Sequence, residues 1–394
     1  MSNTQKKNVP ELRFPGFEGE YSLDIFGNLA TNKSDKFNPQ NENASIDIEL
    51  DCIEQNTGRL IKIYNSKEFS SQKNKFNPQN VLYGKLRPYL NKYYFTKKSG
   101  VCSSEIWVLK STKEDKLLNL FLYYFIQTKR YSDVASKSAG SKMPRADWGL
   151  IENIRVYFPE LCEQQKIGEF FSKLDRQIEL EEQKLELLQQ QKKCYMQKIF
   201  SQELRFKDDN GNDYPEWEEK KLGELSQIVR GASPRPIKDP KWFNKESDIG
   251  WLRISDVTDQ NGKIYHLEQK LSIEGQEKTR VLLTTHLLLS IAASIGKPVM
   301  NFVKTGVHDG FLIFLNPKFN IFFMYYWLDY FKEKWSKYGQ PGSQVNLNSE
   351  IVKSQTLNMP SNHEQEKVGL FFSRNEKLIE LQQEKIMYLK RRKQ

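Results

Sequence analysis

The feature that most constrains the fold is an internal repeat. Residues 163–188 return as residues 364–389 at a constant offset of 201, without a gap. A second block, 120–126, returns as 322–328 at an offset of 202, and both copies run on to a Gly-Ser pair. Repetition of several blocks in the same order predicts two copies of one structural unit.

A third, fainter block opens each half, since Glu-Leu-Arg-Phe occurs at 11–14 and again at 203–206. The middles differ sharply, for instance 32–87 against 233–293. Two related scaffolds with unrelated surfaces favour two related tasks on different targets. A plain duplication that builds a pseudo-symmetric protein fits the repeated helices equally well, but it explains the divergent middles less readily.

Each copy closes on a long helix. Between Pro159 and Phe200 there is no further proline, and Glu, Gln, Lys and Leu, which favour helices, are abundant. Apolar residues recur at spacings of 3, 4 and 7, which draws one stripe along each helix. The stripe residues expected to pack helix against helix are Ile167, Phe171, Leu174, Ile178, Leu185 and Leu188 in the first copy, and Val368, Phe372, Ile379, Ile386 and Leu389 in the second.

A helix of about 40 residues spans roughly 60 Å and buries a single stripe best against a similar partner. The other copy is the obvious partner, and pairing within one chain is most easily antiparallel. Asn375 sits in the second stripe where the first has Leu174, and Glu181 and Gln382 also interrupt the stripes. We interpret these polar residues as register devices, with a water-exposed gap in the seam as the alternative.

The globular parts are typical of an α+β fold. Strand-like runs punctuated by Gly, Pro and Asn dominate both middles, and the aromatic-rich blocks 120–126 and 322–328 are expected to be buried helices. The predicted architecture is two pseudo-symmetric α+β domains separated by two long antiparallel helices that form a coiled-coil spacer. The predicted bounds are 1–158 for the first domain, 159–201 for its helix, 202–359 for the second domain and 360–394 for its helix. Ser361 and Glu364 have the spacing of a capping box, which would start the second helix.

The bulk composition narrows the partner. The net charge is +10, from 60 basic and 50 acidic residues, which favours a polyanionic partner such as nucleic acid. The longest apolar stretches are well short of the about 20 residues that a membrane span needs, and residues 1–8 contain no apolar signal core. The four cysteines and four histidines are scattered, so we expect a reducing cytoplasm, no disulfide and no metal site.

Basic residues cluster beside aromatics at loop positions in both halves. Arginine and lysine can contact guanine, asparagine and glutamine can contact adenine, and serine or lysine can contact phosphate. Each cluster could equally be an ordinary solvated loop. The residues expected to contact a nucleic acid are Lys85, Arg87, Tyr89, Lys142 and Arg145 in the first half, and Arg230, Ser233, Arg235, Lys297, Gln344, Asn346 and Asn348 in the second.

Catalytic motifs are missing. The nearest approach to the Asn/Asp-Pro-Pro-aromatic motif of DNA methyltransferases is 239–242, Asp-Pro-Lys-Trp, in which Lys replaces the second proline. The phosphate-binding pattern GxxxxGK[ST] does not occur, because each Gly-Lys pair is followed by Leu, Ile or Pro. We therefore assign no catalytic residue, and a fused methyltransferase or nuclease is not supported.

This layout resembles the specificity (S) subunits of Type I restriction-modification systems over essentially the whole chain. The opening 10–17 (PELRFPGF), the helix starts 163–168 (EQQKIG) and 364–369 (EQEKVG), and the segment 82–90 (LYGKLRPYL) are typical of that family. The repeated helix is the specific signal, and the loop motifs support it.

The resemblance implies that each variable region is a target-recognition domain and that the helices are a spacer between two half-sites. It implies double-stranded DNA as a partner, read as an asymmetric bipartite target, together with two modification (methyltransferase) subunits and ATP-dependent restriction subunits. In this family S-adenosylmethionine, ATP and Mg are used by the partner subunits. No cofactor is therefore expected on this chain, which would be a non-catalytic, cytoplasmic subunit.

Two other functions stay open on the sequence. A stand-alone sequence-specific DNA-binding regulator would bind its site tightly without partner subunits. A duplicated coiled-coil adaptor would show no salt-dependent DNA binding at all. The second helix ends at 394, in register with Lys193, whereas the first continues to Phe200, so we expect a shorter coiled coil at that end.

Overall fold

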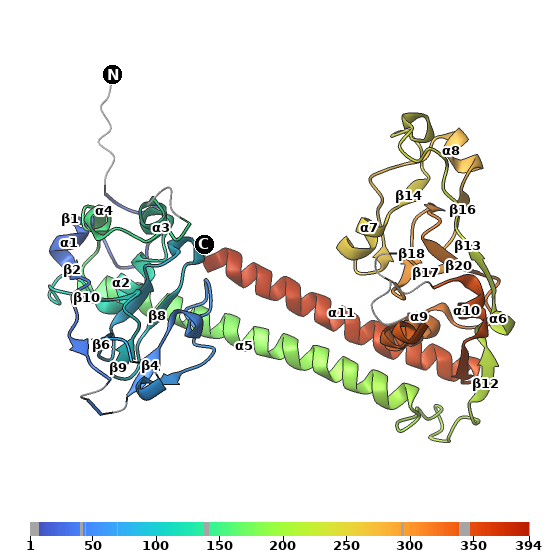
Figure 1. Ribbon diagram of the computed structural model, residues 1–394, viewed down its shortest axis with the longest axis horizontal. Coiled ribbons are helices and arrows are strands. Elements are labelled where there is room, and N and C mark those ends of the chain that lie inside the picture. The colour runs from blue at the N-terminus through green and yellow to red at the C-terminus, as the bar shows by residue number, and fades with distance from the viewer. Residues whose placement is uncertain are drawn as a thin grey trace. The chain divides into compact units, whose positions relative to one another are not determined.

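The computed structural model describes residues 8–39, 42–43, 45–68, 70–137, 142–292, 295–338 and 347–393. The chain divides into two compact units (Figure 1). Unit 1 comprises Met1–Leu180 and Leu389–Gln394, and unit 2 comprises Glu181–Tyr388. Each unit mixes helices with short strands, so the fold is α+β, and each of the two long helices contributes residues to both units.

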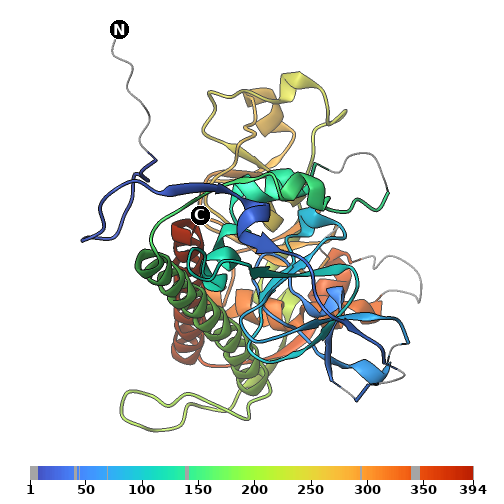
Figure 2. The same cartoon turned by 90° about the vertical axis from the view of Figure 1, so that its left-hand side faces the viewer.

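Unit 1 is built around a four-stranded sheet of order β2-β10-β7-β8 and a five-stranded sheet of order β3-β6-β9-β4-β5, and Figure 2 looks onto this unit. A third, two-stranded sheet pairs β1 with β11. The strands are β1 (Ser22–Ile25), β2 (Ala30–Thr31), β3 (Lys36–Phe37), β4 (Ile46–Ile48), β5 (Tyr64–Asn65), β6 (Lys73–Phe76), β7 (Val81–Gly84), β8 (Tyr93–Phe95), β9 (Gly100–Cys102), β10 (Ile106–Ser111) and β11 (Arg155–Phe158). The short α-helices are α1 (Phe26–Leu29), α2 (Asn119–Phe125), α3 (Lys129–Ala135) and α4 (Trp148–Ile151).

Unit 2 contains a five-stranded sheet of order β13-β20-β17-β18-β15, a three-stranded sheet of order β14-β19-β16 and the pair β12–β21. Its strands are β12 (Glu218–Lys221), β13 (Gln227–Arg230), β14 (Gly250–Leu252), β15 (Lys263–Ile264), β16 (Arg280–Leu282), β17 (Leu287–Ser290), β18 (Pro298–Asn301), β19 (Thr305–Val307), β20 (Phe311–Leu315) and β21 (Thr356–Met359). Its shorter α-helices are α6 (Leu222–Leu225), α7 (Ile254–Asp259), α8 (Ile273–Glu277), α9 (Ile321–Phe331) and α10 (Ser349–Ser354).

The two units share a core strand order although their middles share little sequence. The order β2-β10-β7-β8 in unit 1 corresponds to β13-β20-β17-β18 in unit 2. In the second sheet, β9 pairs parallel with β4 and antiparallel with β6, and β19 pairs parallel with β14 and antiparallel with β16. The divergent middles are therefore two versions of one framework, as expected from the repeat.

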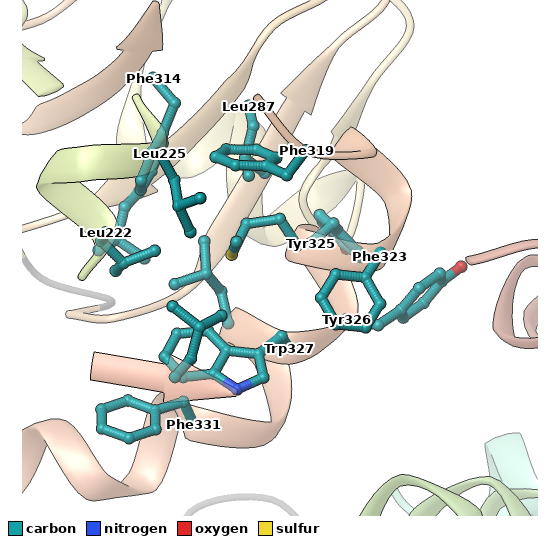
Figure 3. Packing of buried hydrophobic residues seen from close by; sticks show 14 of the residues in the cluster. Leu222, Leu225, Leu287, Phe314, Phe319, Phe323, Tyr325, Tyr326, Trp327 and Phe331 are labelled. Atoms are coloured by element: carbon teal, nitrogen blue, oxygen red, sulfur yellow. The ribbon is translucent and has the colours of Figure 1, made fainter. Parts of the chain in front are cut away.

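The aromatic blocks form buried helices, as expected. In α9 most side chains are buried, because this helix packs between the sheets of unit 2 and the long helices. Figure 3 shows its aromatic side chains in the cluster that also contains Leu222, Leu225 and Phe314. Asn320 caps the helix by accepting hydrogen bonds from the backbone N–H groups of Phe322 and Phe323, at 3.0 and 3.1 Å. In unit 1, α2 is buried in the same manner.

The two long helices are α5 (Leu161–Phe200) and α11 (Asn362–Lys393). They pair antiparallel, since in unit 2 Lys192 contacts Glu376 whereas Glu181, earlier on α5, contacts Lys385, later on α11. Ser361 Oγ accepts from Glu364 N at 3.4 Å, which is one half of the expected capping box, while the Glu364 carboxylate accepts from other side chains.

The polar residues in the stripes behave differently from one another. The Gln382 amide donates to the backbone oxygen of Glu181 at 2.9 Å and to its carboxylate at 2.7 Å, so this pair joins the two helices. The Asn375 amide donates to Phe371 O of its own helix at 2.8 Å. The interpretation of Asn375 as a register device therefore has no support from this bond, whereas the contact of Gln382 fits it.

Candidate nucleic-acid interface

Five of the predicted contact residues lie on two segments of unit 1 that the fold brings together. Lys85 N donates to Glu105 O at 3.0 Å, and Lys85 O accepts from Ala146 N at 2.8 Å. Arg87 N donates to Pro144 O at 2.7 Å, and Leu86 forms an isolated antiparallel bridge with Arg145. The loop that follows β7 is thus held by backbone hydrogen bonds to residues 144–146. The five predicted contact residues on these two segments are Lys85, Arg87, Tyr89, Lys142 and Arg145.

Glu105 holds Arg145 in a fixed orientation. The guanidinium donates through Nε to Oε2 at 3.0 Å and through Nη2 to Oε1 at 3.2 Å, and these bonds raise the pKa of Arg145. The side chain of Arg145 is nevertheless 51% exposed. Arg87, Tyr89 and Lys142 are also exposed, so this end of unit 1 presents three cations and an aromatic ring to solvent.

In unit 2, three predicted residues converge on Asp309. Ser233 Oγ donates to Asp309 Oδ1 at 2.8 Å, and Arg235 Nη2 donates to Oδ2 at 2.8 Å. Arg230 Nε donates to the backbone oxygen of Asp309 at 2.6 Å. Burial alone would raise the pKa of Asp309, but Ser233, His308 and the two arginines outweigh it and hold the pKa below its ordinary value.

The two acidic residues occupy equivalent places. Glu105 lies in the turn between β9 and β10, and Asp309 lies in the turn between β19 and β20, its counterpart in unit 2. Each acid holds an exposed arginine that comes from a different segment of the chain, Arg145 in one unit and Arg235 in the other. Sequence reasoning missed both acids. Only their place in the turn before a strand-like run could have indicated them.

A hollow of about 500 Å³ lies beside the Asp309 turn. Its lining combines aromatic, aliphatic, basic and amide side chains: Ile237, Lys238, Pro240, Phe243, Trp251, Arg253, Ile254, Gln269 and His308. Burial lowers the pKa of His308, Asp309 raises it and the arginines at 230 and 235 lower it further, with a net lowering. His308 Nδ1 accepts from Gly310 N at 2.9 Å, which requires the neutral ring.

The remaining predicted contact residues of unit 2 are placed differently. Lys297 is half-buried, its Nζ donates to Val257 O at 3.3 Å, and burial, followed by the charge of Lys332, lowers its pKa. Asn348 caps α10 by accepting from Ile351 N at 3.0 Å, as Asp147 caps α4 in unit 1. The other two, Gln344 and Asn346, lie outside the described residues, as do both Gly-Ser pairs.

The repeated helix starts have structural roles. Gln164 in unit 1 and Gln365 in unit 2 are buried, and each accepts from the backbone N–H that precedes an aromatic helix, at 2.9 and 2.8 Å. Gly168 allows close approach of α2, because a Cβ there would lie 2.7 Å from the Leu120 side chain. The repeated motif therefore positions the globular parts on the helices.

The predicted stripe residues are buried or half-buried, and several of them, such as Ile167 and Phe171, pack against the core of a globular part. Leu174, Ile178 and Leu389 form a buried cluster with Phe171, and Val368 and Phe372 are buried in the core of unit 2. The other members are Ile386, which is buried, and Ile167, Leu185, Leu188 and Ile379, which are half-buried.

Within the residues that the structure describes, no helix is both long and apolar enough to cross a membrane. Among the same residues, no group of three or more His, Cys, Asp or Glu side chains is placed to hold a metal ion.

The chain matches the family model described as "Type I restriction modification DNA specificity domain" twice, over residues 20–190 and 214–391. The chain belongs to this family. It is the specificity subunit of a Type I restriction-modification system, and such subunits are non-catalytic.

Relatives agree with this assignment. The specificity subunit is 26% identical over 307 residues to the Type I restriction enzyme MjaVIII specificity subunit of Methanocaldococcus jannaschii, covering 73% of this chain and 70% of that protein. It is 25% identical over 169 residues to the Type I restriction enzyme EcoDI specificity subunit of Escherichia coli, covering 41% of this chain and 37% of that protein.

Solved structures show the same fold. A chain from a study of complex assembly and conformational transition of the Type I R-M system superposes with a TM-score of 0.60 at 17% identity, covering 98% of the specificity subunit and 97% of that chain. The S subunit of a Type I system from M. genitalium superposes with a TM-score of 0.58 at 13% identity, covering 98% and 96% of the two chains.

Proposed function

We propose that this specificity subunit binds an asymmetric bipartite DNA target, one half-site through each target-recognition domain, 1–158 and 202–359. The observation that carries the proposal is the equivalent turn in each unit. There an exposed arginine is held by a carboxylate, Arg145 by Glu105 and Arg235 by Asp309, and further cations lie beside it. The surroundings of the two turns differ, as two different half-sites require.

The geometry suits base recognition. An arginine contacts a base edge best when its guanidinium is already oriented, because less side-chain freedom is lost on binding. The carboxylates of Glu105 and Asp309 each occupy part of one guanidinium, and the exposed remainder can donate to guanine. Arg87, Lys142 and Arg230 would then contact phosphates, and the hollow beside His308 would accommodate a protruding base edge.

We further propose that two modification subunits and the restriction subunits dock on the repeated surface rather than on the recognition surfaces. Leu180 and Leu381 occupy equivalent positions on the two long helices and are both exposed, as are Leu12 and Leu204 of the Glu-Leu-Arg-Phe blocks. A surface that occurs once in each copy of the repeat suits the binding of two copies of the same partner. S-adenosylmethionine, ATP and Mg would act on those partner subunits, and the complex would work in the cytoplasm, where the DNA is.

The test is to mix the purified chain with its modification subunit and S-adenosylmethionine and to map adenine methylation on a plasmid library. We expect methylation at one asymmetric bipartite motif, dependent on this chain. Arg145→Ala should relax the sequence at one half-site only, and Arg235→Ala at the other. Each loss corresponds to about 1–3 kcal/mol of discrimination.

Arg176→Ala is the matched control, since Arg176 is exposed on α5 and pairs with Glu179 of the same helix. Absence of any bipartite motif in an assembled complex would overturn the proposal and favour the adaptor. Tight specific DNA binding by the chain alone, without methylation in the complex, would instead favour the stand-alone regulator.

A further inference from the structure

A second repeated feature joins each globular part to both long helices. In unit 1, Asp175 on α5 accepts from the Tyr124 hydroxyl of α2 at 3.1 Å and pairs with Lys393 of α11 at 2.6 Å. Lys393 Nζ also donates to Gln127 Oε1 at 3.1 Å. One carboxylate thus binds a residue of the globular part and a residue of the opposite helix.

Unit 2 contains the same arrangement with the helices exchanged. Glu376 on α11 accepts from the Tyr326 hydroxyl of α9 at 2.8 Å and pairs with Lys192 of α5 at 3.1 Å. Lys263 of β15 adds a second ion pair to the same carboxylate. We call these two groups the α5 lock (Asp175, Tyr124, Lys393) and the α11 lock (Glu376, Tyr326, Lys192).

The locks occupy equivalent positions in the repeat. Asp175 and Glu376 are 201 residues apart, as are Lys192 and Lys393, and Tyr124 and Tyr326 are 202 apart, which are the offsets of the two repeated blocks. In each lock the lysine Nζ also lies over the tyrosine ring, 5.9 Å from the centroid in the α5 lock and 5.4 Å in the α11 lock. An arrangement of acid, base and ring that recurs in this detail is not an incidental surface ion pair.

The α11 lock is buried, which makes its partners mutually dependent. The side chains of Glu376, Lys192 and Lys263 are 10%, 16% and 12% exposed. Burial alone would raise the pKa of Glu376, but the two lysines and the Tyr326 hydroxyl outweigh it and hold the pKa below its ordinary value. The Glu376 carboxylate has a strong preference for one geometry, since sliding α11 by a turn would carry it away from both Lys192 and Lys263.

From these contacts we infer that the two locks are positioning devices that fix the register of α5 against α11 and the seating of each recognition domain on the helix pair, and that they thereby determine the spacer length of the bipartite target. The inference rests on the proposed function. Both helices contribute to both locks, so a shifted register of the helices would break both locks. Asp175, Glu376 and their partners touch no DNA base in this scheme and act only through position.

The experiment maps methylation by the full complex on a library in which both half-sites are constant and the spacer varies by single base pairs. The test variants are Asp175→Asn, Glu376→Gln and the milder Tyr124→Phe and Tyr326→Phe, which keep the charges. We expect unchanged half-sites, but about a tenfold loss of preference for the original spacer over one differing by one base pair, equivalent to about 1.4 kcal/mol. The exchange Asp175→Lys with Lys393→Asp should restore the preference.

The matched controls are Arg176→Ala and Lys377→Ala, which break exposed ion pairs within one helix immediately beside the two acids. They should leave the spacer preference unchanged. Variants that methylate less but keep the original spacer preference would overturn the inference, because that is the behaviour of a merely stabilising contact. A wild-type complex without any bipartite motif would overturn the proposed function itself, so the two failures are distinguishable.

Discussion

Arg13 donates to both carboxylate oxygens of Glu163, from Nε at 2.9 Å and from Nη2 at 2.7 Å. Arg205 makes the same two-pronged contact with Glu364 at 3.3 and 2.9 Å, and the two glutamates are almost completely buried. Each arginine belongs to the Glu-Leu-Arg-Phe block and each glutamate to the start of a long helix. Two repeated motifs that are far apart in sequence therefore contact each other, and their recurrence reflects one buried ion pair that occurs in both units.

Glu364→Gln should destabilise unit 2 by about 3 kcal/mol, because it leaves Arg205 without its buried counter-charge. The Glu364 carboxylate also accepts from Trp217 Nε1 at 2.9 Å, so the buried indole would lose a charged acceptor as well. Denaturant unfolding followed by tryptophan fluorescence measures the loss. Glu366→Gln, an exposed neighbour on the same helix, serves as the control and should change stability by under about 0.5 kcal/mol. Equal stability of the two variants would contradict a stabilising role for the Arg205–Glu364 ion pair.

Gly231→Ala should disturb the Asp309 turn. A Cβ at this position would lie 2.2 Å from His308 O and 2.7 Å from Val307 O, and these are backbone atoms that cannot move aside alone. We expect a loss of about 1–3 kcal/mol of stability and weaker recognition of the half-site read by unit 2. Thermal unfolding and methylation mapping are the two measurements. Gly149→Ala, where the nearest atom is 3.4 Å away, should leave both unchanged. Wild-type stability and wild-type recognition in Gly231→Ala would contradict the tight fit of Gly231 against the Asp309 turn.

His308 should make the stability of unit 2 depend on pH. Its pKa is lowered in the folded state, so below its ordinary value of about 6.5 the unfolded chain binds more protons than the folded one. Stability contributed by the neutral ring is therefore complete above about pH 6.5 and declines as the pH falls toward the folded pKa, by at most about 1.4 kcal/mol per pH unit. His308→Gln should flatten the unfolding free energy between pH 7.5 and 5.5. An identical slope in the two proteins would refute this assignment.

The parts of the fold that follow from local pattern were predictable. The stripe and the absence of proline predicted a helix over 159–201, and α5 runs from Leu161 to Phe200, because helix formation depends on neighbours three and four residues apart. Residues 251–254 (WLRI) have the pattern of a strand and show the limit of local pattern, since β14 ends at Leu252 and α7 begins at Ile254. A short apolar run can form either a strand or a helix, and the tertiary structure decides between them.

What could not be predicted depends on distant partners. Ser233 and Asp309 are separated by 76 residues, and nothing in either local pattern indicates that they meet. The same holds for Lys297, which was expected to contact a nucleic acid. In the fold its ammonium group turns to Val257 O. The shared sheet order of the two units was equally hidden, since it depends on which distant strands pair in the folded chain.

Unit 2 encloses apolar residues of α5 at a place where unit 1 has a groove. In unit 2 the aromatic ring of Phe200 stacks on Phe372, with centroids 5.8 Å apart, and on Tyr330 at 5.2 Å, and Ile199 is buried beside it. Unit 1 has a groove of about 1010 Å³ at the corresponding place. Its apolar lining includes Phe121, Tyr124, Phe125, Ile167, Phe171 and Ile178. Phe171 is the repeat counterpart of Phe372, and Lys390 and Lys393 of α11 also line the groove.

Appending the sequence of residues 194–200 (CYMQKIF) after Gln394 should therefore stabilise unit 1. Gln394 is in register with Lys193, so the added isoleucine and phenylalanine would continue α11 and enter the groove as Ile199 and Phe200 enter the core of unit 2. Burying two such side chains contributes about 1.5–3 kcal/mol each, and the cost of ordering the added residues is shared with an extension that carries serine at the same two positions, so we expect the apolar extension to be more stable than the serine one by about 3 kcal/mol. Thermal unfolding measures it, with an extension that carries serine at the two apolar positions as the control. If both extensions behaved alike, the groove would not be the counterpart of the filled site in unit 2, and the equivalence of the two helix ends would not extend beyond Leu389.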